Sequence, residues 1–495
     1  MTYHRRDSGR SKSGGATPPA RWKQTLSAGR NCWRIPASSR LSFLIDAKAY
    51  FDAVVAAMEK AERRIIIVGW DFDSRIMLRP DREGAAKLQL GTFLRNLVEA
   101  RPGLEIYVLI WSSSLFYGRS GEALLPLGRI WWCHPRIKFR LDSHHPAGAS
   151  HHQKIVTVDD RLAFVGGMDL TEGRWDDMRH APENPYRRTS SGKQHDATHD
   201  VQVAFDGPAA GAITEIAMER WKYATGEELG AIGPTKDVWP ADLEPAVRDH
   251  PVAIARTQPP HNDQPAIREV AALNMDMLAA ASKSIYIEAQ YFALPDVAEV
   301  LAQGLQVPQG PEVIIVMSGG PQGMFERYVM AENRDRMLTL LRRSDRFGRL
   351  RAFYPIWNRK PPYRIKVHSK LIIVDDRILR IGSSNLNARS LGLDTECDIA
   401  LEAEHDGASE AIAVLRDMLL AEHLGTTREE VTAMQLKHRS LVLAIDELNG
   451  TAPRQLATPQ LEGVKEATPM PGTELLDPRR PLSWRYVWRW LTSSD

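Results

Sequence analysis

The most chemically suggestive residues of this sequence are a histidine and a lysine two positions apart, which occur twice with a downstream aspartate. The pattern H-x-K-x4-D is present at His152, Lys154 and Asp159 and again at His368, Lys370 and Asp375. Side chains two positions apart in an extended strand point to the same face. Each copy is therefore predicted to project one imidazole and one ammonium group together.

Two imidazoles and two ammonium groups in one pocket suit a phosphate and the negative charge that grows on it during nucleophilic attack. Displacement at phosphorus needs a nucleophile and a proton for the departing alkoxide. One neutral imidazole can attack while a protonated one donates, and the second can then activate the incoming water or alcohol. The lysines and the amide of Asn385 would stabilise the phosphate oxygens without needing a metal ion. The pattern therefore indicates phosphodiester chemistry.

The flanking residues show that the two copies belong to a duplicated unit. Residues 152–169 align without gaps with residues 368–385, at an offset of 216 (368 − 152). Strand-like apolar runs at residues 64–68 and 284–288 precede the two copies at an offset of 220 (285 − 65). A near-constant offset indicates two copies of one structural unit.

Each copy alternates helical and strand-like segments. An amphipathic helix (47–61 or 266–281) is followed by a strand, a loop and helix, a second β-rich run (104–111 or 312–318), and the His-Lys strand with its return strand. This alternation predicts an α/β sandwich with a largely parallel, buried sheet in each half. We expect two tandem halves related by a pseudo-twofold axis, with a helical C-terminal extension.

Composition shifts predict the domain boundaries. The expected segments are a basic disordered arm at 1–40, a first half at 41–224, a Pro/Gly/Asp-rich linker at 225–264, a second half at 265–424, and a helical and Pro/Gly-rich extension at 425–495. The arm holds nine Lys and Arg residues and one acidic residue. Its Ser-rich, acid-poor character would also suit an organellar transit peptide, but it has no apolar core of the kind that secretory signals carry.

The duplicated motif resembles the hallmark of the phospholipase D superfamily, and the resemblance covers residues 41–422. Stretches at 164–176, 199–203, 219–221 and 285–292 are similar to the phospholipid-cleaving branch of that family. The sequence departs from the branch at Ala289, where Asn is common, and it has Asp169 where the second copy has Asn385. We interpret the Asp as a substitution that leaves catalysis intact and makes the two halves unequal.

The resemblance implies a phosphohistidine mechanism with His152 as the nucleophile and His368 as the general acid and then the base. It also implies a downstream carboxylate for each imidazole. The best candidates are Glu396, 28 residues after His368, and Asp200, 48 residues after His152. Such carboxylates would fix the tautomer and stabilise the imidazolium. By the same resemblance, the two motif aspartates are more structural than chemical.

Five further residues are candidates for substrate contact: Asp169, Ser383, Trp70, Gln290 and Tyr291. Trp70 would line a headgroup or acyl pocket or else lie in the core, and both fates are equally open for Tyr291. A turn-forming role competes with phosphate contact for Ser383 and for its neighbours Ser384 and Asn387.

The sequence indicates no metal site and no disulfide framework. The three cysteines, Cys32, Cys133 and Cys397, are far apart and form no C-x-x-C pair. His144, His145 and His151 lie close together in the sequence, but no carboxylate or cysteine completes a ligand set at a recognised spacing. We expect these histidines to form a solvated loop. No cofactor is required by the predicted chemistry, and calcium dependence stays open.

No apolar run reaches the roughly 18 residues needed to span a bilayer. We expect a cytoplasmic protein, free or peripheral to the membrane, that reaches lipid through loops, the basic arm or a C-terminal Trp/Arg helix. That helix places Trp484, Trp488 and Leu491 on one face. It would lie either on the protein surface or in a membrane interface.

These observations predict an enzyme that hydrolyses or transfers the phosphatidyl group of glycerophospholipids, with water or an alcohol as the acceptor. Cardiolipin synthesis is the transfer version. A nuclease is the alternative within enzymes, but a net charge of only +2 gives no basic field that would favour nucleic acid. A lipid-binding scaffold without turnover is the alternative outside enzymes, and the intact His-Lys pairs argue against it. One chain carries both copies, so a monomer would suffice.

Overall fold

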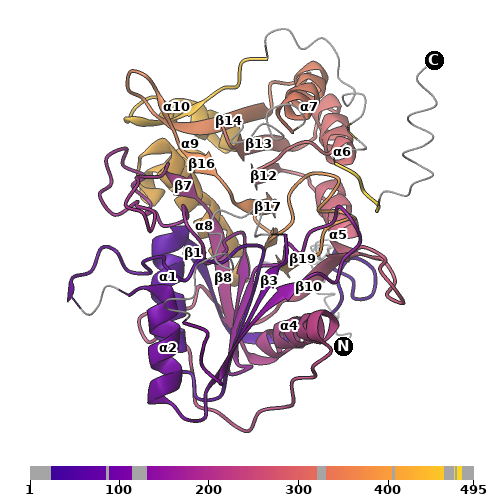
Figure 1. Cartoon of the computed structure of the whole chain (residues 1–495). Helices are drawn as coiled ribbons and strands as arrows, with labels where there is room; N and C mark the ends of the chain where they lie inside the picture. The colour runs from indigo at the N-terminus through magenta and orange to yellow at the C-terminus, as the bar shows by residue number, and fades with distance from the viewer. Residues whose placement is uncertain are drawn as a thin grey trace, which may run out of the picture.

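The computed structural model of the chain describes residues 24–84, 88–113, 131–319, 330–403, 407–461, 473 and 477–481. Helices and strands alternate along both halves of the sequence (Figure 1). This confirms the α/β class that the hydrophobic pattern predicts.

The first half forms one sheet with helices on both faces. The strand order is β4 (Ile137–Asp142), β3 (Glu105–Trp111), β2 (Arg64–Gly69), β5 (Ile155–Val158), β6 (Leu162–Gly166), β8 (Val201–Asp206), β1 (Ala37–Ile45) and β9 (Val247–Pro251). The helices are α1 (Asp46–Met58), α2 (Leu90–Ala100) and α4 (Gly207–Thr225).

The second half repeats this order. Its sheet runs β11 (Ile267–Arg268), β10 (Ala253–Gln258), β19 (Glu396–Glu402), β18 (Ile378–Gly382), β17 (Lys370–Val374), β12 (Ser284–Ala289), β13 (Glu312–Met317), β14 (Leu350–Trp357) and β15 (Tyr363–Arg364), and β20 (Arg454–Ala457) also pairs with β14. The helices are α5 (Glu269–Ala279), α6 (Pro295–Gln306), α7 (Ala331–Ser344) and α8 (Gly407–Leu424). The matching orders confirm the predicted duplication.

Both sheets are mixed, which corrects the prediction of largely parallel sheets. In the first half β2, β3 and β4 are parallel, whereas β5 pairs antiparallel with both β2 and β6. The His-Lys strand must run antiparallel to its return strand because a three-residue turn joins the two. Asp159 and Asp160 in that turn have left-handed φ values of 51° and 56°.

The two sheets share a central helical layer. Alternate strand residues such as Ile66 and Ile314 face a core that also holds side chains of α4 and α8. Their neighbours Ile65 and Val313 face the outer cores, which contain α1 and α2 in the first half and α5, α6 and α7 in the second. The period-two alternation of the buried runs therefore builds five layers, α-β-α-β-α, and Figure 1 shows the two halves one above the other.

A short parallel ribbon joins the halves. β7 (Thr198–His199) of the first half pairs with β16 (Lys366–Val367) of the second. β7 lies directly before Asp200, and β16 lies directly before His368. The sequence pattern gives no sign of this ribbon because each of its strands has only two residues.

The N-terminal boundary of the folded protein lies earlier than predicted. Residues 1–23 lie outside the described residues, but residues 24–40 are folded and are not part of a disordered arm. Leu26 and Cys32 are buried in the core of the second half, and the Thr25 backbone N–H donates to Glu402 over 2.9 Å. β1 already begins at Ala37. Leu26 and Cys32 are two isolated apolar residues in a polar segment, so they give no periodic signal.

The predicted linker is also structured in part. Its residues form β9, which pairs with β1 of the first sheet, and β10, which pairs with β19 of the second. In the C-terminal extension, α9 (Arg428–His438) and α10 (Leu441–Leu448) confirm the expected helical stretch. The Trp/Arg helix expected around Trp484 lies outside the described residues. No helix among the described residues is long and apolar enough to cross a membrane.

Candidate functional site

The two His-Lys segments lie where the halves touch. The backbone N–H of His152 donates to the carbonyl of Thr395 over 3.0 Å, and that of His368 donates to the carbonyl of His199 over 2.8 Å. Each His-Lys segment therefore runs beside a segment of the other half. The next residue along each of those segments is a buried carboxylate, Glu396 or Asp200.

Each motif histidine is held by the carboxylate of the opposite half. His152 Nδ1 lies 2.9 Å from Glu396 Oε2, and His368 Nδ1 lies 2.6 Å from Asp200 Oδ2. Spacing along the chain associates each carboxylate with the histidine of its own half, and the structure exchanges them. Burial raises the pKa of both carboxyl groups. With Nδ1–H donated to the carboxylate, the lone pair of a neutral imidazole stays on Nε2.

The two lysines have different partners. Lys154 Nζ lies 3.1 Å from Asp169 Oδ2, whereas Lys370 Nζ donates to Gln290 Oε1 over 2.9 Å. Asn385 stands where the first copy has Asp169, and its buried Oδ1 accepts no hydrogen bond from the described residues. The second copy therefore has no carboxylate at the position where the first copy holds one against Lys154.

The surroundings of the site lower the pKa values of both motif histidines and of Lys370. Burial lowers the pKa of His152 and of His368 well below the ordinary value, and the nearby charges of Lys154 and Arg174, respectively, lower them further. Burial also lowers the pKa of Lys370 to about 7. In the substrate-free site both imidazoles are therefore neutral at neutral pH, which suits nucleophilic attack.

The motif aspartates hold the backbone of the fold. Asp159 accepts the backbone N–H groups of residues 62–64 at 2.7, 2.8 and 2.8 Å. Asp375 accepts those of residues 282–284 at 2.8, 2.7 and 2.9 Å. Each carboxylate thus ties the start of the central strand, β2 or β12, to the turn that follows the His-Lys strand. This geometry supports the structural interpretation of both residues.

The first residue after each return strand contacts one of the two carboxylates that hold the motif histidines. A Cβ atom at Gly167 would lie 2.3 Å from Asp200 Oδ1, so only glycine fits at this position. The equivalent residue of the second half, Ser383, donates its hydroxyl to Glu396 Oε2 over 2.5 Å. The structure therefore places Ser383 on the carboxylate that holds His152.

The remaining candidates lie beside the catalytic strands. Trp70 is half-buried, its backbone N–H donates to Asp169 over 2.8 Å, and its ring stacks on Trp111 with centroids 5.5 Å apart. Tyr291 is also half-buried, whereas the adjacent Phe292 is in the core. Trp70 is therefore neither fully buried in the core nor fully exposed. Its indole ring and that of Trp111 form an aromatic wall at the end of β2.

The prediction of a solvated histidine loop is wrong for His151. This residue is fully buried, and its Nδ1 lies 3.3 Å from Asp142 Oδ2. Arg220 pairs with the same carboxylate, and burial lowers the pKa of His151 to about 3. His144 and His145 are half-buried. The buried carboxylate partner lies at the end of β4, which the local spacing of the histidines could not reveal.

Sequence reasoning missed Arg174 as a site residue. Its side chain is buried, and neither Nε nor Nη1 has a hydrogen-bond partner among the described residues. Its charge reaches His368, Lys370 and Asp200. A buried guanidinium with free donors is suited to an anionic ligand. The available signal was its position five residues after Asp169, within a motif already recognised.

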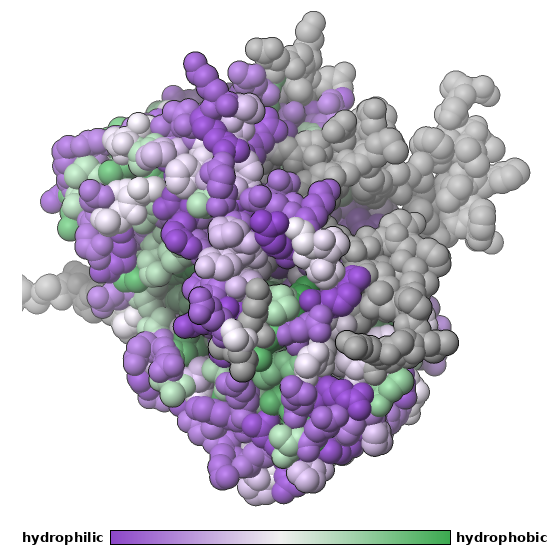
Figure 2. All heavy atoms as spheres, turned by 60° about the vertical axis from the view of Figure 1, so that its left-hand side comes forward, coloured by the Kyte–Doolittle hydropathy of each residue, from purple (hydrophilic) through white to green (hydrophobic). Residues whose placement is uncertain are grey.

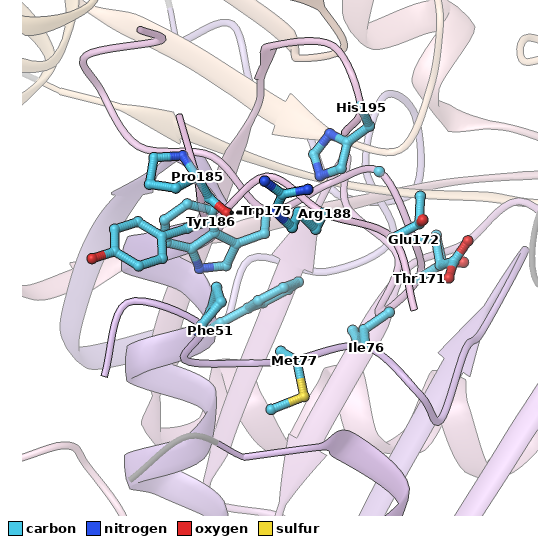
Figure 3. A pocket seen from close by; sticks show the side chains of 13 residues that line it. Phe51, Ile76, Met77, Thr171, Glu172, Trp175, Pro185, Tyr186, Arg188 and His195 are labelled. Atoms are coloured by element: carbon cyan, nitrogen blue, oxygen red, sulfur yellow. Dashed lines mark hydrogen bonds between the residues drawn. The ribbon is translucent and has the colours of Figure 1, made fainter. Parts of the chain in front are cut away.

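A pocket opens beside this segment on the outer side of the first half (Figure 3). It has a volume of about 110 Å³, and apolar and aromatic side chains make up much of its wall: Phe51, Ile76, Met77, Trp175 and Tyr186. Arg188 and His195 add polar groups from the segment that connects β6 to β7.

Figure 2 shows apolar residues gathered across the middle of one face of the molecule, bordered by hydrophilic ones.

Comparisons with known protein families support the duplicated architecture. A family model described as "Cardiolipin synthase, PLD-like domain" matches residues 275–418. The solved phosphatidylserine synthase of Haemophilus influenzae Rd KW20 superposes with a TM-score of 0.53 at 15% identity, covering 82% of this chain and 94% of that one. A likeness at this identity shows the fold.

Curated relatives are similar over part of their length. Cardiolipin synthase A of Pseudomonas putida is 27% identical over 379 residues, which are 73% of this chain and 64% of that protein. Phospholipase D1 of Homo sapiens is 32% identical over 192 residues, or 37% of this chain and 16% of that protein. Phospholipase D zeta 1 of Arabidopsis thaliana is 28% identical over 216 residues, or 38% and 19%. The chain thus matches less than two thirds of the length of each of these relatives.

Proposed function

Since this chain belongs to the phospholipase D superfamily, we propose that it exchanges the phosphodiester of a glycerophospholipid through a phosphatidyl group bound to histidine. The observation that carries the proposal is the pair of imidazoles, each held at Nδ1 by a buried carboxylate of the opposite half. This arrangement leaves two Nε2 atoms for chemistry, one for attack and one for proton transfer.

In the first step, Nε2 of His152 attacks phosphorus. A P–N bond forms, and the P–O bond to the departing headgroup alcohol breaks. His368, protonated at Nε2, gives its proton to that leaving oxygen. The negative charge of the bound phosphate opposes the burial that lowers the pKa of His368, so substrate binding favours the protonated form that this step needs.

In the second step, the oxygen of water or of an alcohol attacks phosphorus on the same histidine. His368 Nε2 takes the proton of that oxygen, the new P–O bond forms, and the P–N bond breaks. His152 is then neutral and His368 is protonated, as when the substrate was bound at the start of the first step. Glu396 and Asp200 keep Nδ1–H in place in both steps and stabilise each imidazole when it carries positive charge.

Buried cations stabilise the phosphate oxygens. Lys154 and Lys370 each extend from the same segment as a motif histidine, and Arg174 adds a guanidinium with free donors. The negative charge on phosphorus oxygens increases in the transition state, where preorganised cations in a buried site are most effective. We assign the Asn385 amide to the same role, because Asn385 occupies in the second copy the position that Asp169 has in the first.

Water as the acceptor gives phosphatidic acid, and an alcohol gives a new phosphatidyl ester. Transfer to the headgroup of phosphatidylglycerol is the cardiolipin-forming case, and the similarity to cardiolipin synthase A over 73% of the chain supports this version. Both acceptors share one intermediate, so one enzyme can form both products.

The test is incubation of the purified full-length chain with phosphatidylcholine and phosphatidylglycerol liposomes, with and without a primary alcohol, followed by mass spectrometry of the lipids. We expect phosphatidic acid, a phosphatidyl alcohol or cardiolipin from the wild type and none from His152→Ala or His368→Ala. His438→Ala, on the outer helix α9, serves as the matched control. No lipid product together with cleavage of DNA or RNA would contradict the proposal in favour of a nuclease.

A further inference from the structure

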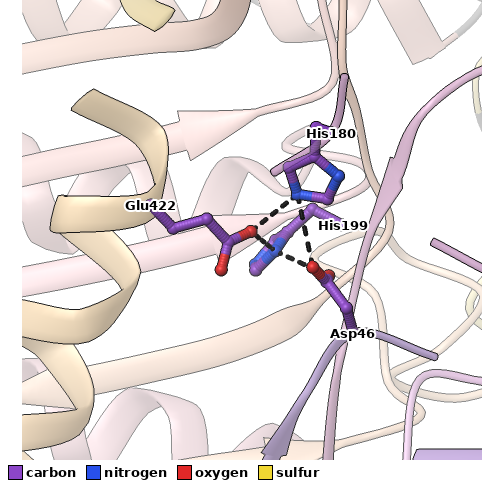
Figure 4. A group of neighbouring side chains, drawn as sticks. All are labelled: Asp46, His180, His199 and Glu422. Atoms are coloured by element: carbon purple, nitrogen blue, oxygen red, sulfur yellow. Dashed lines mark hydrogen bonds and ion pairs between the residues drawn. The ribbon is translucent and has the colours of Figure 1, made fainter. Parts of the chain in front are cut away.

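A second cluster of histidines and carboxylates lies at the contact between the halves, and the mechanism does not use it. Its members are Asp46 at the start of α1, His180 in the segment between β6 and β7, His199 in β7, and Glu422 in α8 (Figure 4). One nitrogen or oxygen atom of each residue lies within 4.8 Å of the others. All four side chains are buried.

The four groups converge from different directions. His180 Nε2 lies 2.6 Å from Glu422 Oε1 and 3.4 Å from Asp46 Oδ2. His199 Nδ1 lies 2.7 Å from Glu422 Oε1 and 3.1 Å from Asp46 Oδ1. Ligands about 2.0 Å from a tetrahedral ion lie roughly 3.3 Å apart. The cluster therefore matches a four-ligand site with only a small expansion.

The opposite ring nitrogen of each histidine is bonded to a further carboxylate. His180 Nδ1 lies 2.8 Å from Asp176 Oδ2, and His199 Nε2 lies 2.9 Å from Glu288 Oε2. Histidines that bind metal ions almost always donate their second ring N–H in this way, which fixes the tautomer and aims the lone pair at the ion. The remaining ring nitrogen of each histidine, His180 Nε2 and His199 Nδ1, faces the centre of the cluster.

Two carboxylate oxygens of the cluster remain without hydrogen bonds. Asp46 Oδ2 and Glu422 Oε2 are buried, and neither has a hydrogen-bond partner among the described residues. Figure 4 shows Asp46 directed toward the two imidazoles. With both imidazoles neutral, these two carboxylates balance the charge of one divalent cation. We propose that Asp46, His180, His199 and Glu422 bind a structural zinc ion that joins the two halves.

The ligand set decides the type of ion and its role. Two imidazole nitrogens with two carboxylate oxygens are ligands that suit zinc, whereas calcium and magnesium prefer oxygen alone. All four positions are filled by protein side chains that are shielded from solvent, so no position is left for a substrate. This is the arrangement of a structural site and not of a catalytic one.

The site connects with the positioning of His368. The Asp46 backbone N–H donates to the Asp200 carbonyl over 2.8 Å, and the Asp200 backbone N–H donates to Asp46 Oδ1 over 3.2 Å. Glu422 belongs to the second half, whereas the other three ligands belong to the first. The ion would therefore hold the halves together next to the carboxylate that orients His368.

No sequence pattern indicates this site, because the ligands come from four separated segments. The nearest pair, His180 and His199, is 19 residues apart (199 − 180), and no recognised metal motif has that spacing. His180 also lies in the polar segment that connects β6 to β7. The four ligands come together only when the two halves pack against each other.

The test is metal analysis of the untagged full-length chain, grown with zinc and purified without chelators. We expect about one zinc per chain by plasma mass spectrometry, and loss of it in Glu422→Gln and His180→Gln. His151→Gln is the matched control, because His151 is an equally buried histidine beside a carboxylate and should keep the metal. Circular dichroism reports whether each variant is folded.

Cobalt substitution of the wild type keeps the proposal falsifiable if the variants do not fold. We expect the intense visible absorption of tetrahedral Co²⁺, together with a higher melting temperature of the metal-loaded chain than of the chelator-treated chain. A wild type that holds no metal after growth and after reconstitution would overturn the proposal. Metal retained in both folded ligand variants, or an octahedral Co²⁺ spectrum, would overturn it as well, and the cluster would then be a network of imidazolium and carboxylate ion pairs.

Discussion

At the scale of single residues, the exchange of carboxylates between the halves assigns a function to each of them. Asp200 lies on His368, and Glu396 lies on His152. Removing one carboxylate therefore impairs the histidine of the other half. If His368 is the general acid, loss of Asp200 impairs proton donation to the leaving group, and loss of Glu396 impairs the nucleophile.

Leaving-group chemistry separates these two effects. We expect Asp200→Asn and Glu396→Gln each to lower kcat on a natural phospholipid by on the order of 10³–10⁴-fold. A phosphatidyl ester of p-nitrophenol needs little protonation of its leaving oxygen, so it should restore the formation step in Asp200→Asn but not in Glu396→Gln. The measurement is the burst of nitrophenol in the first turnover. Restoration in Glu396→Gln alone would show that the roles of the histidines are reversed.

The lowered pKa of Lys370 predicts a limit on activity at high pH. Burial lowers this pKa to about 7, so the cation that faces the phosphate is present below that pH and is lost as the pH rises through it. We expect kcat/KM, which reports the free enzyme, to fall above about pH 7. Lys370→Arg keeps its charge and should move this fall to higher pH even if its rate is lower. An unmoved alkaline limb in a folded Lys370→Arg variant would contradict the assignment.

At the scale of elements, we expect the motif aspartates to stabilise the fold without taking part in the chemistry. Asp159 fastens the start of β2 through three backbone N–H groups. We expect Asp159→Asn to lower the free energy of unfolding by about 1–3 kcal/mol, because the amide keeps the left-handed turn but turns one acceptor into a donor. Urea denaturation measures this cost.

The folded fraction of Asp159→Asn should keep its kcat, since the carboxylate is occupied by the backbone. Asp160→Asn, in the same turn with the same left-handed φ, controls for the turn itself. A loss of kcat as large as that of His152→Ala, with unchanged unfolding, would show that the motif aspartate takes part in the chemistry.

The sequence predicted the elements whose signal is local or repeated. The duplicated motif, the strands β2 and β12, and the helices α1 and α5 all follow from periodicity and from the constant offset between the copies. The residue types at Asp200 and Glu396 were also identified. The histidine that each one holds could not be predicted. The exchange depends on a ribbon of two-residue strands beside Asp200 and on an isolated bridge between His151 and Thr395 beside Glu396, and neither has a periodic pattern.

The remaining corrections have the same physical origin. The antiparallel pairing of β5 with β2 and the burial of Cys32 on the second half both depend on contacts between residues far apart in the chain. A single sequence shows which side chains must be buried, but not which distant element covers them. Arg174 differs, since a buried cation beside a recognised motif could have been suspected.

At the scale of the whole molecule, a lipid substrate requires contact with a membrane surface. Residues 1–23 carry six Lys and Arg residues, and residues 482–495 hold Trp484, Trp488 and Trp490 with two arginines. Such segments favour anionic interfaces. We expect deletion of both to reduce co-sedimentation with phosphatidylglycerol liposomes, and high salt to reduce binding of the wild type.

Deletion should stop at residue 23, since Leu26 and Cys32 belong to the folded core. Turnover of a short-chain, water-soluble phospholipid serves as the control and should be unchanged in the truncated chain. Unchanged liposome binding after both deletions would place membrane contact on the folded halves.

The central claim is that one histidine carries the phosphatidyl group while the other transfers protons. The most direct measurement is mass spectrometry of His368→Ala after a short incubation with the p-nitrophenyl phosphatidyl ester. We expect a phosphatidyl adduct on the peptide that contains His152, because the P–N bond can form but no base remains to activate water. An adduct on another residue, or steady product formation with no adduct and no burst, would contradict it.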